Sequence, residues 1–278
     1  MPPLLRKPQN RTVESLENHY QVERQLADRL RASNREERRQ ILATMYDELF
    51  AKVPDHPRLT RRRGEELTRQ YNQGKMSLIS SFLRPDMVFL EFGAGDCEFA
   101  KAVASRVKKV YAVDIADQRN PDNPSPANME LVVYDGYNLD VIPDNSIDLV
   151  FSDQLIEHLH PDDSRDHFIL IRRILKPGGI YLIRTPHAMG GPHDISKYFS
   201  DVPQGFHMKE WTHAELEQMV LDLGYTDVRA YRNIKGWVVR MPMVLLRPFE
   251  RLLSICPRSI RVPLVGLLFH SLVMSIRK

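Results

Sequence analysis

The sequence predicts an α/β protein built on a Rossmann-like, mostly parallel sheet with helices on both faces. Between residues 86 and 231, short runs of Val, Ile, Leu, Phe and Tyr alternate with segments of helical periodicity. This alternation is typical of a parallel sheet that is covered by helices on both sides. Of the 278 residues, 42% are hydrophobic and 27% are charged, which excludes a disordered or fibrous chain.

Residues 1–80 are expected to form a helical N-terminal extension or cap. Apolar residues recur at helical spacing over residues 41–53, and a second helical stretch at about 65–82 ends before Pro85. The pattern changes after this proline. We therefore assign residues 81–278 to the main domain.

Six strands are expected in the main domain and a seventh at the end of the chain. They cover residues 88–92, 109–113, 129–134, 147–152, 180–185, 226–231 and 271–276. Helices are expected between them, for example at 161–175 and after Thr212, which can form a capping box with Glu215. Residues 238–268 are predicted to be an apolar, basic helical insertion before the last strand, because apolar side chains recur there at helical spacing among arginines.

The formal net charge of +3 conceals an uneven distribution along the chain. Residues 1–80 carry +5, residues 81–235 carry −8 and residues 236–278 carry +6. Solvated helix faces are the commoner reason for basic segments, but anionic partners and membrane surfaces also attract them. Residues 238–268 are therefore a candidate for peripheral membrane contact. With two cysteines and no apolar stretch after the N-terminal charges, a cytoplasmic location is expected.

A glycine loop follows the first predicted strand and opens the first helix after it. It reads Glu91-Phe92-Gly93-Ala94-Gly95-Asp96-Cys97. In this setting glycines allow a tight turn and a close approach of backbone N–H groups to a ligand. Asp114 closes the second strand 19 residues after Gly95, where an acid can bind the hydroxyl pair of a ribose. The loop therefore predicts a cofactor that contains a nucleoside.

The side chains around this loop favour S-adenosylmethionine over a dinucleotide. The dinucleotide fingerprint has a third glycine where this chain has Glu98. A pyrophosphate would then lie among Glu91, Asp96 and Glu98, where like charges repel it. S-Adenosylmethionine carries a sulfonium, an ammonium and only one carboxylate, so it is the better electrostatic match.

At these segments the chain resembles the class I S-adenosylmethionine-dependent methyltransferases, specifically the group that includes many small-molecule methylating enzymes. The resemblance covers roughly residues 70–231. Its segments are the glycine loop, with Cys97 where a third glycine is frequent, Asp114, Asp135-Gly136, Ser152-Asp153-Gln154 with the following Leu155-Ile156-Glu157-His158-Leu159, and Ile174-Leu175-Lys176-Pro177-Gly178-Gly179. Two segments also have a simpler interpretation, because Asp135-Gly136 is a competent turn pair and Asp153 could cap a helix.

The resemblance implies which residues hold the cofactor. They are Glu91, Phe92, Gly93, Ala94, Gly95, Asp114, Ile115, Asp135, Gly136, Asp153, Gln154 and Tyr71. Asp114 takes the place of the acid that binds the ribose, and Asp135 with Gly136 takes the place beside the edge of the adenine. Tyr71 lies just before the sheet, in the segment with which some relatives cover the methionine end of the cofactor.

The segment after the fifth predicted strand is rich in groups that can hold and deprotonate an acceptor. We predict His193 as the general base, oriented by Asp194 or another acid, with His158 and His207 as the next candidates. The predicted substrate-contacting residues are His187, Tyr198, Phe199 and Trp211. For any one of these histidines, a structural hydrogen bond is the commoner role. A metal site from His187, His193, Asp194 and His207 matches no strong ligand spacing, so no metal is predicted.

The leading interpretation is a methyltransferase that uses S-adenosylmethionine to methylate a hydroxyl oxygen of a small-molecule or glycan-like acceptor by in-line displacement. Two alternatives remain. A nucleic-acid methyltransferase would use the basic flanks, but no clustered aromatic and basic stripe supports it and no nucleic acid is expected as partner. A non-catalytic protein would bind the cofactor and act at a membrane or partner through residues 238–268.

Overall fold

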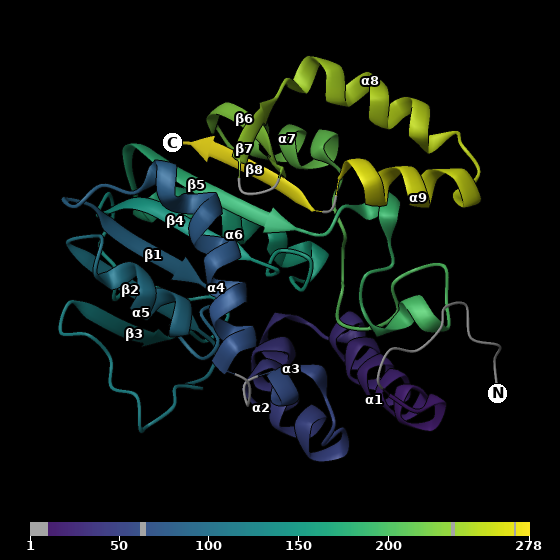
Figure 1. Cartoon of the computed structure of the whole chain (residues 1–278). Coiled ribbons are helices and arrows are strands. Elements are labelled where there is room, and N and C mark those ends of the chain that lie inside the picture. The colour runs from purple at the N-terminus through teal and green to yellow at the C-terminus, as the bar shows by residue number, and fades with distance from the viewer. Residues whose placement is uncertain (1–10, 62–64, 235–236, 270) are drawn as a thin grey trace.

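The centre of the molecule is a twisted sheet. The computed structural model describes residues 11–61, 65–234, 237–269 and 271–278, and the sheet within them has eight strands in the order β3-β2-β1-β4-β5-β8-β6-β7 (Figure 1). The strands are β1 (Val88–Phe92), β2 (Lys109–Asp114), β3 (Met129–Val133), β4 (Ile147–Asp153), β5 (Leu175–Thr185), β6 (Thr226–Ile234), β7 (Trp237–Met241) and β8 (Leu272–Arg277). Strands β1 to β5 are parallel, and β8 is antiparallel to both β5 and β6. The predicted α/β class with a mostly parallel sheet is confirmed.

The strand count differs from the prediction, because the segment predicted as a helical insertion at 238–268 begins with a strand. Trp237–Met241 forms β7, which pairs antiparallel with β6. Val238 and Val239 are β-branched and favour an extended backbone, and the exposed edge of β6 offers them a partner. Helical structure starts only with α8 (Met243–Ser254) and continues in α9 (Arg258–Leu268) before β8.

Helices cover both faces of the sheet, and adjacent strand residues point to opposite faces. Phe89 packs in one core cluster with α4 (Glu65–Ile79) and α5 (Glu98–Ala104). Leu90 packs in the other cluster with α6 (Pro161–Ile174) and α7 (His213–Asp222). The short 3-10 helices are η1 (Ser80–Phe82), η2 (Ala188–Gly190) and η3 (Ile195–Tyr198). Burial on both sides explains why the strands read as continuous apolar runs.

The first three helices of the helical extension lie at the carboxyl edge of the parallel strands, whereas the fourth crosses one face of the sheet (Figure 1). The extension consists of α1 (Val13–Ala32), α2 (Arg35–Lys52), α3 (Pro57–Arg61) and α4. Leu26 of α1 and Leu49 of α2 pack with Phe206, which belongs to the long segment after β5. Residues 1–10 and 62–64 of the predicted extension at 1–80 lie outside the described residues.

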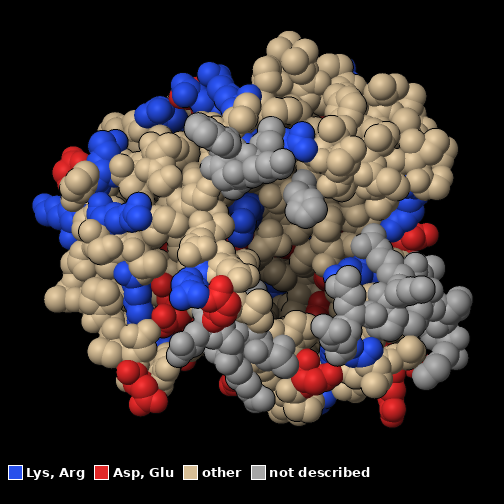
Figure 2. Space-filling view, viewed as in Figure 1, with Lys and Arg blue, Asp and Glu red and all other residues tan. Residues whose placement is uncertain are grey.

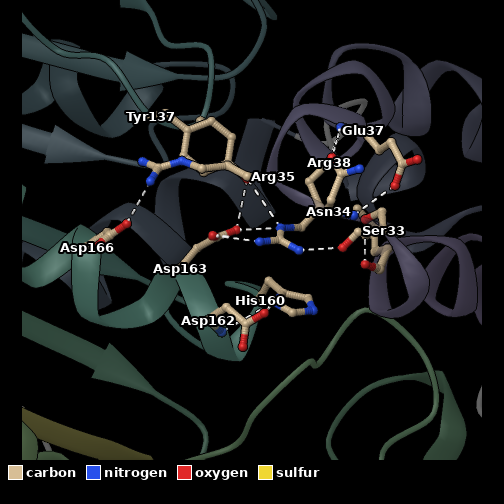
Figure 3. A network of polar contacts seen from close by, with 12 residues as sticks. Ser33, Asn34, Arg35, Glu37, Arg38, Tyr137, His160, Asp162, Asp163 and Asp166 are labelled. Carbon is tan, nitrogen blue, oxygen red and sulfur yellow. Dashed lines mark hydrogen bonds and ion pairs between the residues drawn. The ribbon is translucent and has the colours of Figure 1, made fainter.

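A partly buried ion pair fixes the extension to the main domain. The Arg38 guanidinium of α2 donates to both carboxylate oxygens of Asp163 in the first turn of α6, at 2.7 and 2.9 Å. The Tyr137 hydroxyl donates to the same carboxylate at 2.9 Å, and Arg35 lies over the Tyr137 ring while it pairs with Asp166 (Figure 3). A bidentate arginine–carboxylate pair fixes the orientation of both side chains. The pair therefore holds α2 in a fixed position over the sheet edge.

A second buried carboxylate joins α8 to the start of α7. Glu250 Oε1 accepts hydrogen bonds from His187 Nε2 at 2.7 Å and from His213 Nδ1 at 2.8 Å. The backbone N–H groups of His213 and Ala214 also donate to this carboxylate, at 2.9 and 3.0 Å. Burial tends to raise the pKa of Glu250, but the hydrogen bonds from the two histidines outweigh it and hold this pKa well below its ordinary value. A negative charge at a helix N-terminus is also favourable.

We predict that Glu250→Gln lowers the free energy of unfolding by about 2–4 kcal/mol, because four buried N–H donors lose a charged acceptor. Urea denaturation at neutral pH measures this loss. Since the folded-state pKa is depressed, the stabilisation is present above the ordinary value of 4.5 and is lost as the pH falls below it. The difference between the two proteins should therefore shrink in acid. The exposed Glu36→Gln is the matched control, and an equal loss there would contradict the prediction.

Candidate functional site

The glycine loop opens onto a cavity of about 390 Å³ at the carboxyl edge of the sheet. We call this cavity the glycine-loop cavity. Ten of the twelve residues predicted to hold the cofactor line it, namely Tyr71, Phe92, Gly93, Ala94, Gly95, Asp114, Ile115, Gly136, Asp153 and Gln154. The carboxyl ends of β1, β2 and β4 meet here, which is where ligands bind in open α/β sheets.

Backbone conformation at the loop explains its glycines. Gly93 and Gly95 have positive φ angles of +78° and +58°, and the buried Cys97 also has a φ of +63°. The resemblance placed a frequent glycine at this cysteine, and the left-handed backbone there is the reason. The Gly95 N–H donates to Asp114 Oδ2 at 2.7 Å, so the loop and the end of β2 hold each other in place.

Charged groups are packed together at the wall of the cavity. Lys75 Nζ of α4 lies 3.0 Å from Glu91 Oε1 and 3.7 Å from Asp153 Oδ2. Arg184 of β5 donates to both oxygens of Asp153, at 2.5 and 2.6 Å, and the Tyr71 hydroxyl donates to Asp153 at 2.7 Å. These five side chains form what we call the buried charge cluster.

The two carboxyl groups of the buried charge cluster differ in their pKa. Burial tends to raise the pKa of Asp153, but hydrogen bonds from Arg184 outweigh it and hold this pKa below its ordinary value. Burial raises the pKa of Glu91 to about 7, although Lys75 opposes the change. Glu91 Oε2 is buried without a hydrogen-bond partner among the described residues. Asp153 is therefore ionised at neutral pH, whereas the protonation state of Glu91 changes near neutral pH.

Two residues predicted to hold the cofactor do not line the cavity. Glu91 is only 1% exposed and lies beneath the loop against Lys75. Asp135 accepts from the N–H groups of Tyr137 and Asn138 at 2.8 and 2.7 Å and pairs with Arg39. Its carboxylate therefore stabilises the turn after β3. This agrees with the simpler interpretation of Asp135-Gly136 as a turn pair.

The extension contributes lining residues to the glycine-loop cavity, and the sequence did not predict these residues. Tyr46 of α2 and Arg58 of α3 both line it, and the Arg58 guanidinium lies 5.0 Å from the centre of the Tyr46 ring. Lys75 of α4 lines it as well. In the sequence these residues stand among ordinary solvated helix charges, and no local signal distinguishes them.

A second cavity of about 310 Å³ lies beside the first. We call it the histidine cavity, because His19, His56, His158, His193 and His207 all line it. The two cavities share Tyr46, Pro57, Arg58 and His158 as lining residues. They therefore adjoin along one wall (Figure 2 shows the hollow in the viewed face between the sheet and the extension).

The predicted base lies in the histidine cavity, but a different acid orients it. The His193 side chain is 31% exposed, and its Nδ1 lies 3.1 Å from Glu210 Oε2. Asp194, the acid named in the prediction, instead accepts from the N–H groups of Ser196 and Gly205 at 2.9 Å each. Its carboxylate thus orders the 194–205 loop, and Glu210 has the role predicted for Asp194 or another acid.

The two other candidate histidines, the partly buried His158 and the buried His207, have defined hydrogen bonds. His158 Nδ1 lies 3.0 Å from the Phe206 carbonyl oxygen, which can only accept, so the Nδ1 carries the proton. Burial lowers the pKa of His158 to about 3. His207 Nδ1 lies 2.7 Å from Glu210 Oε1. Burial tends to raise the pKa of Glu210, but hydrogen bonds from His193 and His207 lower it to about 2, so Glu210 is ionised.

Of the four predicted substrate-contacting residues, Tyr198 lines the histidine cavity and the other three line neither cavity. His187 is fully buried against Glu250 and stacks on Phe269. Trp211 is buried in the core, and Phe199 stacks on Tyr20 at 4.7 Å between ring centres. The predicted aromatic contacts are therefore mostly packing of the segment after β5.

Comparisons with known proteins identify the domain. The family described as "Methyltransferase domain" matches residues 90–183. A probable S-adenosylmethionine-dependent methyltransferase of Mycolicibacterium smegmatis is 28% identical over 141 residues, which are 49% of this chain and 51% of that protein. The chain thus spans about half the length of this curated relative.

Solved structures show the same fold at low identity. The Burkholderia thailandensis 1,6-didemethyltoxoflavin-N1-methyltransferase, solved with its substrate and S-adenosylhomocysteine, has a TM-score of 0.54 and 16% identity, covering 88% of this chain and 91% of that one. A chain of the Haloferax volcanii complex between the Trm112 methyltransferase activator and a putative methyltransferase has a TM-score of 0.54 and 18% identity, covering 76% of this chain and 90% of that one.

The glycine-loop cavity fits S-adenosylmethionine in its chemistry. Asp114 lines it, and its Oδ2 accepts only from the Gly95 N–H among the described residues, which leaves a lone pair of this oxygen for a ribose hydroxyl. A Cβ built on Gly95 would meet no atom within 4 Å, so this glycine faces open space. Tyr46, Tyr71, Phe92 and Tyr134 provide aromatic surface for an adenine. Together with the sheet order and the methyltransferase domain matched at residues 90–183, these findings support a class I S-adenosylmethionine-dependent methyltransferase with S-adenosylmethionine as its cofactor.

Proposed function

We propose that the protein methylates a hydroxyl oxygen of a small-molecule or glycan-like acceptor bound in the histidine cavity. The observation that carries the proposal is the shared wall of Tyr46, Pro57, Arg58 and His158 between the two cavities. Methyl transfer is an in-line displacement, so the acceptor atom must face the methyl group at close range. Two adjoining cavities provide this arrangement.

The chain holds the cofactor with the residues of the glycine-loop cavity. S-Adenosylmethionine, when bound, supplies an electrophilic methyl group on a sulfonium. Asp114 accepts from the ribose hydroxyls, and the backbone of Gly93 to Gly95 approaches the cofactor closely. Asp153 stays ionised through Arg184 and holds the Tyr71 hydroxyl in the wall of the cavity. These roles follow from placement and charge.

His193 takes the proton of the acceptor hydroxyl. Glu210 is an acceptor for its Nδ1–H, which leaves the Nε2 lone pair available as the base. The His193 side chain is 31% exposed, whereas that of His207 is 9% exposed and the ring of His158 is held by the Phe206 carbonyl. This partly exposed position supports His193 over the other two.

Arg58 supports an acceptor with a negative or strongly polar group. It lines both cavities and has no ion pair with a carboxylate among the described residues. Burial tends to lower the pKa of Arg58, but the neighbouring Tyr46 and Asp114 outweigh it, so the guanidinium stays protonated. A guanidinium in this position attracts a carboxylate, a phosphate or clustered hydroxyls.

We further propose that α8 and α9 contact a membrane surface. Their exposed apolar side chains are Val244, Leu245, Leu252, Ile255, Ile260, Leu264 and Leu267. Arg240 and Arg251 are exposed near them, and this part of the molecule is largely free of acidic side chains in the viewed face (Figure 2). An apolar face with arginines beside it suits an anionic lipid surface. No helix among the described residues is long and apolar enough to cross a membrane.

Asp114→Asn should weaken S-adenosylmethionine binding about 10- to 100-fold, because a charged acceptor for the ribose is lost. Isothermal titration calorimetry with the cofactor and with its demethylated product measures the change. Asp117→Asn is the control, since Asp117 is exposed, pairs with Arg119 and lines neither cavity. Equal affinity of the Asp114 variant and the wild type would remove Asp114 from the site.

His193→Gln should lower turnover about 10²- to 10⁴-fold, the usual contribution of a general base, and should leave cofactor affinity unchanged. The assay uses methyl-labelled cofactor and a metabolite extract, from which the labelled product of the wild type is identified first. Labelling at the wild-type rate by the variant would show that His193 is not the base. Absence of any product with the wild type, despite cofactor binding, would favour the non-catalytic alternative.

The double variant Leu252→Ser with Ile255→Ser should lose most binding to vesicles that contain anionic phospholipid, because it removes two exposed apolar side chains from the proposed contact face. Vesicle co-sedimentation measures the bound fraction. Val141→Ser is the control, because Val141 is equally exposed but lies in the loop after β3. No sedimentation of the wild type, or equal loss in both variants, would contradict membrane contact through this face.

A further inference from the structure

Three clusters of two histidines and one glutamate lie in the described part of the chain, and all of their members are buried except His56 and His158, which are partly buried. They are His19, Glu23 and His56; Glu157, His158 and His207; and His187, His213 and Glu250. In each cluster one ligand atom from each residue lies within 4.8 Å of the others. Their composition is the same, so their hydrogen bonds must decide which of them has lone pairs left for a metal ion.

Two of the clusters are occupied by donors from the chain itself. Glu250 accepts from both histidines of its cluster and from two backbone N–H groups. Glu23 accepts from His19 at 2.9 Å and from the Phe206 N–H at 2.9 Å, while His19 Nδ1 lies 2.8 Å from a nitrogen of Arg11. The carboxylate oxygens of these two clusters therefore already accept hydrogen bonds from the protein.

The cluster of Glu157, His158 and His207 differs, because its lone pairs remain. Glu157 Oε2 accepts from the Thr185 hydroxyl at 2.8 Å, but Glu157 Oε1 is buried and has no hydrogen-bond partner among the described residues. His158 directs its Nδ1–H to the Phe206 carbonyl, and His207 directs its Nδ1 to the ionised Glu210. In both histidines Nε2 is then the nitrogen left without a partner among the described residues.

This arrangement is the one that metal-binding histidines adopt. A histidine that binds a metal through one nitrogen normally donates its other N–H to a carboxylate or a backbone carbonyl, which fixes its tautomer and orientation. Phe206 and Glu210 provide such partners here, and Thr185 orients the glutamate. Ligands around a tetrahedral zinc are roughly 3.4 Å apart, so closure from 4.8 Å or less needs shifts of about 1 Å at most.

We propose that Glu157, His158 and His207 bind a divalent transition metal ion of the zinc or ferrous type. Imidazole and carboxylate ligands suit these ions, and three protein ligands leave at least one coordination position open. The ion lies near the wall shared by the two cavities, because His158 lines both of them and His207 lines the histidine cavity.

The open position gives the ion a role in the proposed reaction. A hydroxyl group coordinated there has a much lower pKa than in water. Its O–H bond would then break readily, the proton would pass to His193 and the electron pair would stay on the oxygen that is to be methylated. Glu210 connects the two functions, since it contacts both His193 and His207. This role rests on the proposed function, whereas metal binding itself does not.

The test measures metal binding without cofactor or acceptor. Untagged protein is stripped with a chelator and titrated with Zn²⁺ by calorimetry and with Co²⁺ by visible absorption. We expect one equivalent of each ion, a Co²⁺ spectrum displaced by Zn²⁺, and no binding of Mg²⁺, which prefers oxygen ligands. Glu157→Gln and His207→Gln should each lower Zn²⁺ affinity at least 100-fold. Glu210→Gln, which changes only a supporting partner, should lower it about 10- to 100-fold.

His187→Gln is the matched control, because it alters the cluster of the same composition whose acceptors are already used, and it should leave Zn²⁺ affinity unchanged. Circular dichroism and thermal melting verify that each variant is folded. The proposal is overturned if the stripped wild type binds neither ion at high micromolar concentration, or if folded Glu157 and His207 variants bind as the wild type does. Metal binding without methyl transfer would sustain this inference and contradict the proposed function instead.

Discussion

The buried charge cluster is the constraint on which the arrangement of the site depends. Lys75 and Arg184 face Glu91 and Asp153 at the point where α4, β1, β4 and β5 meet. Removal of one partner from such a group leaves an uncompensated buried charge, which typically costs about 3–5 kcal/mol. The cluster therefore fixes α4 relative to the three strands. Because Tyr71 of α4 donates to Asp153, the same interaction positions one wall of the glycine-loop cavity.

The buried charge cluster also determines the position of the helical extension, which forms part of the site. With α4 fixed, the Arg38–Asp163 pair fixes α2 over the sheet edge, and α3 between them carries Arg58 to the wall between the cavities. Some of the basic side chains of residues 1–80 thus form contacts inside the molecule. Arg38, Arg58 and Lys75 all line the glycine-loop cavity, so the extension supplies cations to a region whose strands supply carboxylates.

Local sequence patterns predicted the sheet and the glycine loop. The other parts of the site depend on contacts between segments that are distant in the sequence. The apolar runs, Gly93 and Gly95, and Asp114 at the end of β2 can each be read within a few residues. Glu210 as the partner of His193, and Arg58 beside His158, depend on segments that meet only in three dimensions. Strand β7 was missed for a related reason: Val238 and Val239 extend because β6 offers them an edge. The same holds for His187, whose partner Glu250 is 63 residues away.

The three histidine and glutamate clusters show why residue type alone does not assign a role. A carboxylate whose oxygens accept from several N–H groups is satisfied, and it stabilises the fold where it lies, as Glu250 does at the start of α7. A buried carboxylate oxygen without a donor carries the cost of desolvation without compensation, so it favours a proton or a cation. Glu157 Oε1 is in this state among the described residues. The two adjacent imidazoles, each with Nδ1 already engaged, offer lone pairs rather than protons in their neutral form. A cation shared by all three satisfies every one of these groups at once, which a proton on Glu157 alone does not.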